Sequence, residues 1–277
     1  MAYGADRAVT GSCHGLTAGG HRILIDCGLQ QGAGDKDNAT LPFSPGTVDY
    51  LLITHAHIDH SGRVPMLMKL GFQGSIFTTR LTKQLLQVML RDSAHIQESE
   101  AQWRNRKAER AGEPLVEPTY TMNDALAAIR LLRPVKYGEL LQVAGGIFLR
   151  MTDVGHLLGS ACIELWLTED GETRKIVFSG DVGNQNQPII NNPQYVEETD
   201  YLVLESTYGN RNHSGQRGNA VADLAFWLQR AFDRGGNVVI PSFAVGRTQE
   251  MLYAIREIKQ KGMVTGHPDF PVYVDSP

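Results

Sequence analysis

The sequence is poor in cysteine and in long apolar runs. Its 277 residues include three cysteines, Cys13, Cys27 and Cys162, and no two of them have the spacing of a thiolate metal site. An odd and widely spaced set gives no disulfide framework, so we expect reduced thiols. No apolar run is long enough to cross a bilayer, and the N-terminal residues lack the apolar stretch of a signal peptide. We therefore expect a cytoplasmic protein with no membrane partner.

The sequence also lacks an excess of positive charge. It has 26 Lys and Arg residues against 30 Asp and Glu residues, a formal net charge of −4. Such a chain has no overall attraction for nucleic acid, so a polyanionic substrate would have to be held by a local patch or by metal ions. Composition therefore neither establishes nor excludes a nuclease. The 42% hydrophobic content is enough for the core of one large or two ordinary domains.

What the sequence does contain is a histidine-rich window at residues 55–60, His-Ala-His-Ile-Asp-His. It follows an apolar, β-branched run that predicts a buried strand ending at the first histidine. His55 and His57 are two residues apart in extended chain and project to the same side. Asp59 and His60 follow at a turn into a helix, where they can face a second ion. Such histidines can also be hydrogen-bonded without metal, but four strong ligands in six residues would be costly to bury unpaired.

Other predicted strands also end next to polar residues that can carry chemistry. The strand at 22–25 precedes Asp26, 147–151 leads to His156, 175–178 leads to Asp181, and 201–204 precedes Glu205. Helices are predicted at 82–110, 121–132, 221–233 and 247–260, and a further strand at 237–241. Because α/β folds commonly build their sites at strand ends, we expect these polar side chains to converge.

The order of these motifs resembles that of the metallo-β-lactamase-fold hydrolases. Segments 155–160, 204–209 and 241–249 further resemble the β-CASP branch of nucleases, which includes RNase J and the nuclease of the mRNA polyadenylation machinery. Segments 9–14 and 125–134 are similar to prokaryotic relatives of that polyadenylation nuclease. The resemblance implies an α/β protein with a four-layer αββα sandwich at residues 1–200. The first part of a parallel α/β β-CASP domain would follow at residues 201–277.

The resemblance also implies a two-metal site. One ion would be bound by His55, His57 and His156, the other by Asp59 and His60, with Asp181 bridging the two and Asp26 orienting a histidine ligand. Imidazole and carboxylate ligands favour zinc, with manganese or iron possible at an oxygen-richer position. Two such ions can polarise a phosphoryl oxygen and activate water for attack on phosphorus.

Three further residues receive predicted roles at the substrate. Glu205 resembles the acidic residue at the start of the β-CASP region and joins Asp59 and Asp181 as a catalytic candidate; a capping or loop carboxylate is the alternative. Ser242 and Arg247 flank a predicted helix start, where backbone amides and a guanidinium suit a phosphate. A tight strand-to-helix turn without a ligand is the alternative explanation for that segment.

The family pattern is incomplete in this chain. Two expected histidines have no counterpart, one that would complete the second metal site and one that would pair with Glu205. The last histidine, His267, lies in a Gly-His-Pro-Asp turn outside the family context. We interpret the chain as an N-terminal fragment or a truncated copy, and expect weak or absent activity from it alone. A homodimer would form through regions missing here.

The leading functional hypothesis is a metal-dependent phosphodiesterase that cleaves single-stranded RNA. A DNA nuclease of the same branch stays open, because no residue pattern reads a 2′-hydroxyl. A small-molecule metallo-hydrolase would not need the region that begins at Glu205. A non-catalytic scaffold paralogue would be expected to lose ligands, whereas all six ligand positions available in this chain are filled.

Overall fold

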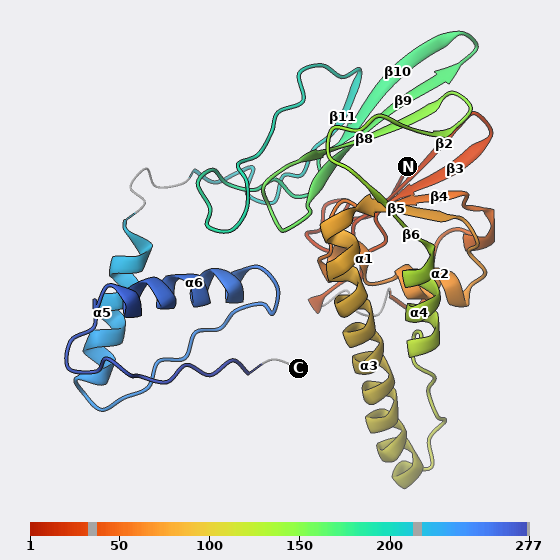
Figure 1. Ribbon diagram of the computed structural model, residues 1–277. Helices are drawn as coiled ribbons and strands as arrows, with labels where there is room; N and C mark the ends of the chain where they lie inside the picture. The colour runs from red at the N-terminus through yellow and green to blue at the C-terminus, as the bar shows by residue number, and fades with distance from the viewer. Residues whose placement is uncertain (33–37, 213–217, 276–277) are drawn as a thin grey trace. The chain divides into compact units, whose positions relative to one another are not determined.

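The chain forms two compact units, residues 1–205 and residues 206–277. The computed structural model describes residues 1–32, 38–212 and 218–275 (Figure 1). Within these ranges, none of the helices combines the length and the apolar character that crossing a lipid bilayer requires. The assignment of a metallo-β-lactamase domain to residues 1–200 and a partial β-CASP domain to residues 201–277 stays a prediction.

The first sheet of the larger unit has six strands in the order β1-β2-β3-β4-β5-β6. Their bounds are β1 Ala2–Gly4, β2 Cys13–Ala18, β3 His21–Ile25, β4 Tyr50–Leu52, β5 Ser75–Thr79 and β6 Leu132–Val135. The first three strands pair antiparallel, and β3 to β6 pair parallel. Leu51 and Leu52 on β4 are both fully buried, as expected for a parallel strand whose two faces are covered.

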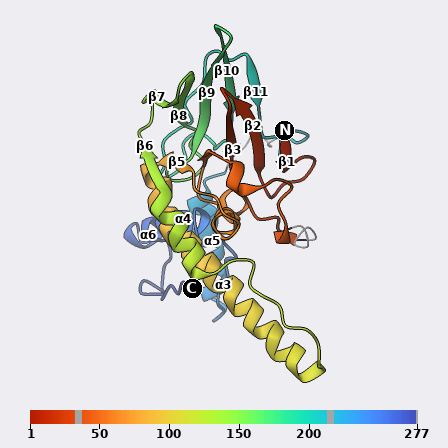
Figure 2. The same cartoon turned by 90° about the vertical axis from the view of Figure 1, so that its right-hand side faces the viewer.

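Helices pack beside the parallel part of this sheet. They are α1 Ile58–Ser61, α2 Val64–Lys69, α3 Arg80–Ala111 and α4 Met122–Leu131, with a short 3-10 helix at Pro45–Thr47. Helices α3 and α4 lie side by side beneath β5 and β6 (Figures 1 and 2). Leu86 and Leu90, one turn apart on α3, are fully buried. The predicted helices at 82–110 and 121–132 are confirmed.

The second sheet has five strands in the order β11-β10-β9-β8-β7. Their bounds are β7 Leu141–Ala144, β8 Ile147–Asp153, β9 Ala161–Glu169, β10 Glu172–Phe178 and β11 Tyr201–Val203. All pairs are antiparallel except β10 with β11. Ile25 and Leu52 of the first sheet share one buried core with Leu149, Met151 and Ile163 of the second. The predicted α/β fold with two packed sheets is confirmed.

The outer face of the second sheet carries a buried carboxylate. Glu164 on β9 accepts hydrogen bonds from Arg150 Nε and NH2 at 2.8 and 2.7 Å and from Thr152 Oγ1 at 2.7 Å. Lys175 Nζ lies 2.6 Å from its other side. Burial opposes the charged form, but these bonds outweigh it and lower the pKa of Glu164 to about 2. Residues 194–198 line the same surface pocket as Arg150, Glu164 and Lys175.

The smaller unit is built on two helices, α5 Ala220–Phe232 and α6 Arg247–Gln260, which confirm the predictions at 221–233 and 247–260. The predicted strand at 237–241 is wrong, because no strand is assigned there. The segment still alternates: Val238 and Ile240 pack against the core of the helices, whereas Val239 is 88% exposed. The described residues of this unit offer no neighbouring strand, and a strand needs one for its backbone hydrogen bonds.

We expect replacement of Glu164 by Gln to lower the free energy of unfolding by about 2 kcal/mol at pH 7, because charged hydrogen bonds are lost. The folded-state pKa of Glu164 lies below its ordinary value of 4.5. The stabilisation is therefore present above that value and is lost as the pH falls toward 2. Urea unfolding at pH 7 and pH 3 should show a smaller difference between wild type and variant at pH 3.

Glu172→Gln is the matched control for this prediction. Glu172 pairs with Arg174 at 2.7 Å, but both side chains are exposed. Such a surface pair contributes less than about 1 kcal/mol. Equal losses in the two variants, or a Glu164→Gln effect that grows as the pH falls, would contradict this account of the buried cluster.

Candidate metal centre

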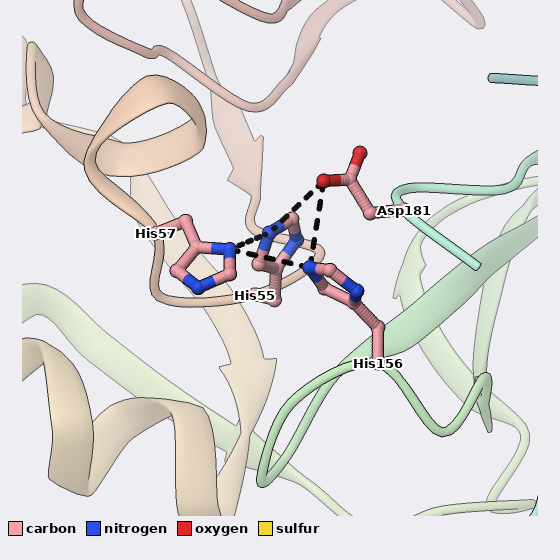
Figure 3. A group of neighbouring side chains, drawn as sticks. All are labelled: His55, His57, His156 and Asp181. Carbon is pink, nitrogen blue, oxygen red and sulfur yellow. Dashed lines mark hydrogen bonds and ion pairs between the residues drawn. The ribbon is translucent and has the colours of Figure 1, made fainter. Parts of the chain in front are cut away.

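Four side chains from distant parts of the sequence meet at one end of the two sheets. His55 and His57 follow β4, His156 lies between β8 and β9, and Asp181 follows β10. One ligand atom from each lies within 4.8 Å of the others (Figure 3). His57 Nδ1 is 3.0 Å from His55 Nε2 and 3.2 Å from His156 Nε2. Asp181 Oδ2 is 3.5 Å from His156 Nε2 and 3.8 Å from His55 Nε2.

A second group begins on the other side of the Asp181 carboxylate. His60 Nε2 lies 3.3 Å from Asp181 Oδ1 and 3.8 Å from Asp59 Oδ2. Asp59 and His60 belong to the single turn of α1, which starts directly after His57. Asp181 therefore presents one oxygen to His55 and His156 and its other oxygen to His60. Sequence reasoning placed these six residues near one another, and the structure brings them together.

The three histidines of the first group favour the neutral form. Burial lowers the pKa of His57 and His156, and that of the fully buried His55 well below its ordinary range. Neutral imidazole is the form that binds a metal ion. Three imidazole nitrogens and one carboxylate oxygen form a donor set that fits a divalent cation.

His60 is in the opposite electrostatic situation. Burial acts to lower its pKa, but the carboxylates of Asp26 and Asp181 outweigh burial and raise it well above the ordinary value. In turn, burial acts to raise the pKa of Asp181, and the hydrogen bond and charge of His60 outweigh burial and lower it. At Asp59, burial outweighs the charges of His60 and His57 and raises its pKa. A cation between these groups would replace the positive charge of the His60 proton.

Asp26 lies directly behind the second group. It is 1% exposed, follows β3 and has a positive φ of 59°, which is unusual for a residue other than glycine. Its Oδ2 is 2.7 Å from His60 Nδ1, and its Oδ1 accepts the backbone N–H of Thr54 at 2.8 Å. The carboxylate therefore holds the His60 ring with Nε2 toward Asp181 and Asp59. This geometry agrees with the expectation from the sequence that Asp26 orients a histidine ligand.

The loop that carries His156 is held by residues that sequence reasoning missed. Ser160 Oγ accepts the backbone N–H of His156 at 3.0 Å. Gly159 O accepts the hydroxyls of Thr79 and Thr82 at 2.6 and 2.8 Å. Thr79 caps α3, so the start of this helix fastens the loop. A serine four residues after a ligand histidine was the available signal, whereas the threonines lie nearly 80 residues away in sequence.

The three predicted substrate residues lie in different places. Glu205 follows β11, and its Oε1 accepts the backbone N–H of Val182 at 3.3 Å, next to Asp181. Its charge also acts to raise the pKa of His156. Ser242 and Arg247 belong to the other compact unit, where Arg247 NH1 is 2.9 Å from Glu250 Oε2. Their contact with a phosphate stays a prediction.

Residues 7–208 match the Metallo-beta-lactamase superfamily. The chain belongs to this superfamily. It is 37% identical over 278 residues to Ribonuclease TTHA0252 of Thermus thermophilus, covering 99% of this chain and 57% of that protein. It is 31% identical to Transcription termination factor FttA of Methanothermobacter thermautotrophicus, with 99% and 41% covered. Probable RNase MJ4 of Methanocaldococcus jannaschii is 30% identical, with 98% and 58% covered.

These relatives confirm the predicted resemblance to the β-CASP nuclease branch of the superfamily. The chain spans 57%, 41% and 58% of their respective lengths. The metallo-beta-lactamase fold and the histidine and aspartate cluster together indicate the use of a divalent metal.

Gly28 leaves no room for a side chain next to α1. A Cβ atom at this position would lie 1.6 Å from the backbone carbonyl oxygen of Asp59 and 2.7 Å from the backbone nitrogen of His60. We therefore expect Gly28→Ala to displace the start of α1, destabilise the protein by about 1–3 kcal/mol and weaken metal binding by Asp59 and His60. Thermal unfolding and metal titration measure the two effects.

Gly145→Ala is the control for this packing argument, because no atom lies within 4 Å of the position of its Cβ. This substitution should leave metal affinity unchanged. If Gly28→Ala binds metal as tightly as the wild type does, the close packing of Gly28 on α1 does not support the site.

Proposed function

We propose that the protein is a two-metal phosphodiesterase that cleaves single-stranded RNA. The observation that carries this proposal is the position of Asp181, whose two oxygens face two separate groups of ligands. A carboxylate placed in this way suits a pair of cations, and paired cations are typical of phosphodiester hydrolysis. The ribonuclease names of two of the relatives support RNA as the substrate.

In this proposal, His55, His57 and His156 hold the first cation, Asp59 and His60 hold the second, and Asp181 contacts both. The nitrogen-rich first position favours zinc, and the second, which is richer in oxygen, also suits manganese or iron. When bound, the two cations polarise a phosphoryl oxygen and activate water for in-line attack.

The residues of the chain supply orientation and proton transfer. Glu205 lies near His156 and next to Asp181. We assign it a role in proton transfer to the leaving oxygen. Ser242 and Arg247 are assigned to a substrate phosphate. A cytoplasmic location, where such an enzyme meets RNA, belongs to the same proposal.

A DNA nuclease of the same branch is the second candidate. The metal centre itself does not distinguish the two substrates, because cations held by this group would act on the phosphate, which RNA and DNA share. Comparing cleavage of labelled single-stranded RNA and DNA of the same sequence separates them. If DNA is cleaved faster than RNA, DNA becomes the proposed substrate in place of RNA.

We expect the purified chain to bind about two divalent cations, as measured by plasma emission, because the ligands form two groups on either side of one carboxylate. RNA cleavage, even if weak, should be abolished in Asp59→Ala and His60→Ala, which each remove a ligand of the second cation. A labelled-RNA assay with added zinc or manganese measures this loss.

His95→Ala is the matched control, since this histidine is exposed on α3 and belongs to neither ligand group. It should retain both metal content and cleavage. Undiminished cleavage by Asp59→Ala or His60→Ala would overturn the proposed function, because the reaction would then proceed without the second cation position.

A further inference from the structure

The hydroxyl group of Thr54 lies between the two groups of metal ligands. Thr54 is 1% exposed, and its Oγ1 is 3.0 Å from Nδ1 of His55. The same oxygen is 3.1 and 2.9 Å from the two oxygens of Asp26, which contacts His60. We propose that Thr54 is a positioning residue that fixes one histidine in each group through one shared carboxylate. This inference rests on the metal binding of the proposed function.

The protons available to these groups determine their roles. A threonine hydroxyl has one proton to donate and can also accept, whereas an ionised carboxylate only accepts. Asp26 is surrounded by donors: the backbone N–H and hydroxyl of Thr54, the hydroxyl of Ser12 at 3.2 Å, and His60. The Thr54 hydroxyl therefore donates its proton to Asp26. Its oxygen is then free to accept the Nδ1–H of His55.

These hydrogen bonds fix which ring nitrogen of each histidine faces the other ligands. With its proton on Nδ1, His55 presents the lone pair of Nε2 to the first group, where His57 Nδ1 lies 3.0 Å away. His60 donates its Nδ1–H to Asp26 at 2.7 Å and presents Nε2 to Asp181 at 3.3 Å. The chain of contacts His55–Thr54–Asp26–His60 thus joins the two groups behind the ligands.

The backbone of Thr54 is fixed on both sides. Its N–H is bonded to Asp26, and its C=O accepts the N–H of Ala161 from the second sheet at 2.9 Å. Gly180, the residue before Asp181, packs so closely that a Cβ there would lie 2.9 Å from that of Thr54. Gly180 also has a positive φ of 56°, which glycine adopts readily. Glycine at this position therefore lets the segment that carries Asp181 pass close to Thr54. The hydroxyl therefore has little freedom to move away.

Thr54→Val keeps the branched shape of the side chain and removes its hydroxyl. The variant keeps the backbone N–H bond to Asp26 but provides no hydroxyl donor to it and no acceptor for the Nδ1–H of His55. His55 therefore loses its hydrogen-bond partner, and the carboxylate that orients His60 loses one of its donors. We expect the affinity for both cations to fall by about 10–100-fold, as for other residues that orient metal ligands. Thr54→Ser keeps the hydroxyl and should remain within about threefold of the wild type.

The experiment is a Co²⁺ titration of the metal-free chain, followed by visible absorption and by competition with a chromophoric chelator. It compares the wild type with Thr54→Val, Thr54→Ser and Thr78→Val. Thr78 is the matched control: it is also fully buried, its hydroxyl donates to Ile53 O at 3.1 Å, and it contacts none of the ligands. We expect weaker binding at both positions and an altered Co²⁺ spectrum in Thr54→Val, but not in the other two variants.

Three results would overturn the proposal: wild-type affinity in Thr54→Val, a loss at one position only, or an equal loss in Thr78→Val. If Thr54→Val does not fold, Thr54→Ala provides the same test without the branched methyl groups. Failure of the proposed function can be distinguished from failure of the role proposed for Thr54. A wild-type chain that binds two Co²⁺ ions but cleaves DNA faster than RNA contradicts the proposed function and leaves the role of Thr54 intact.

Discussion

The buried carboxylate of Asp26 is the interaction on which the centre depends. An unpaired charge in the interior costs several kcal/mol, so Asp26 is stable there only while its donors remain in place. These donors are the backbone and hydroxyl of Thr54, the hydroxyl of Ser12 and the ring of His60. The requirement to satisfy one carboxylate therefore fixes the end of β4 and the start of α1 relative to β3.

The centre is also divided between two sheets. The window at residues 55–60 follows β4 of the first sheet, whereas His156 and Asp181 follow β8 and β10 of the second. The apolar core shared by the sheets, which includes Leu52, Met151 and Ile163, holds the two halves together. A change in sheet packing would consequently separate the ligands even if every ligand residue were retained.

Much of this arrangement could be predicted from the sequence, because it is encoded locally. Apolar runs ending at Asp26, His55 and Asp181 indicated both the strands and the polar residues at their ends. The segment 237–241 shows the limit of this reasoning. Its apolar run is typical of a strand, and its side chains alternate in burial in the structure, but strand formation depends on a partner that local sequence does not reveal.

Contacts between distant residues were the other part that the sequence did not reveal. The hydrogen bond between Thr54 and Asp26 spans 28 residues, and the one that fastens Gly159 to Thr79 spans 80. In the sequence, Thr54 is only the last residue of the apolar run before His55, and its hydroxyl acquires a role only when β3 and β4 pair. The ion cluster around Glu164 likewise depends on the register of β8, β9 and β10.

Anomalous X-ray diffraction from zinc-soaked crystals tests the central claim most directly, because it locates the cations without reference to activity. The account predicts two anomalous peaks on opposite sides of the Asp181 carboxylate, one next to His55, His57 and His156 and one next to Asp59 and His60. A fully soaked crystal with no peak at these residues, or with a single peak that Asp181 does not contact, would contradict it.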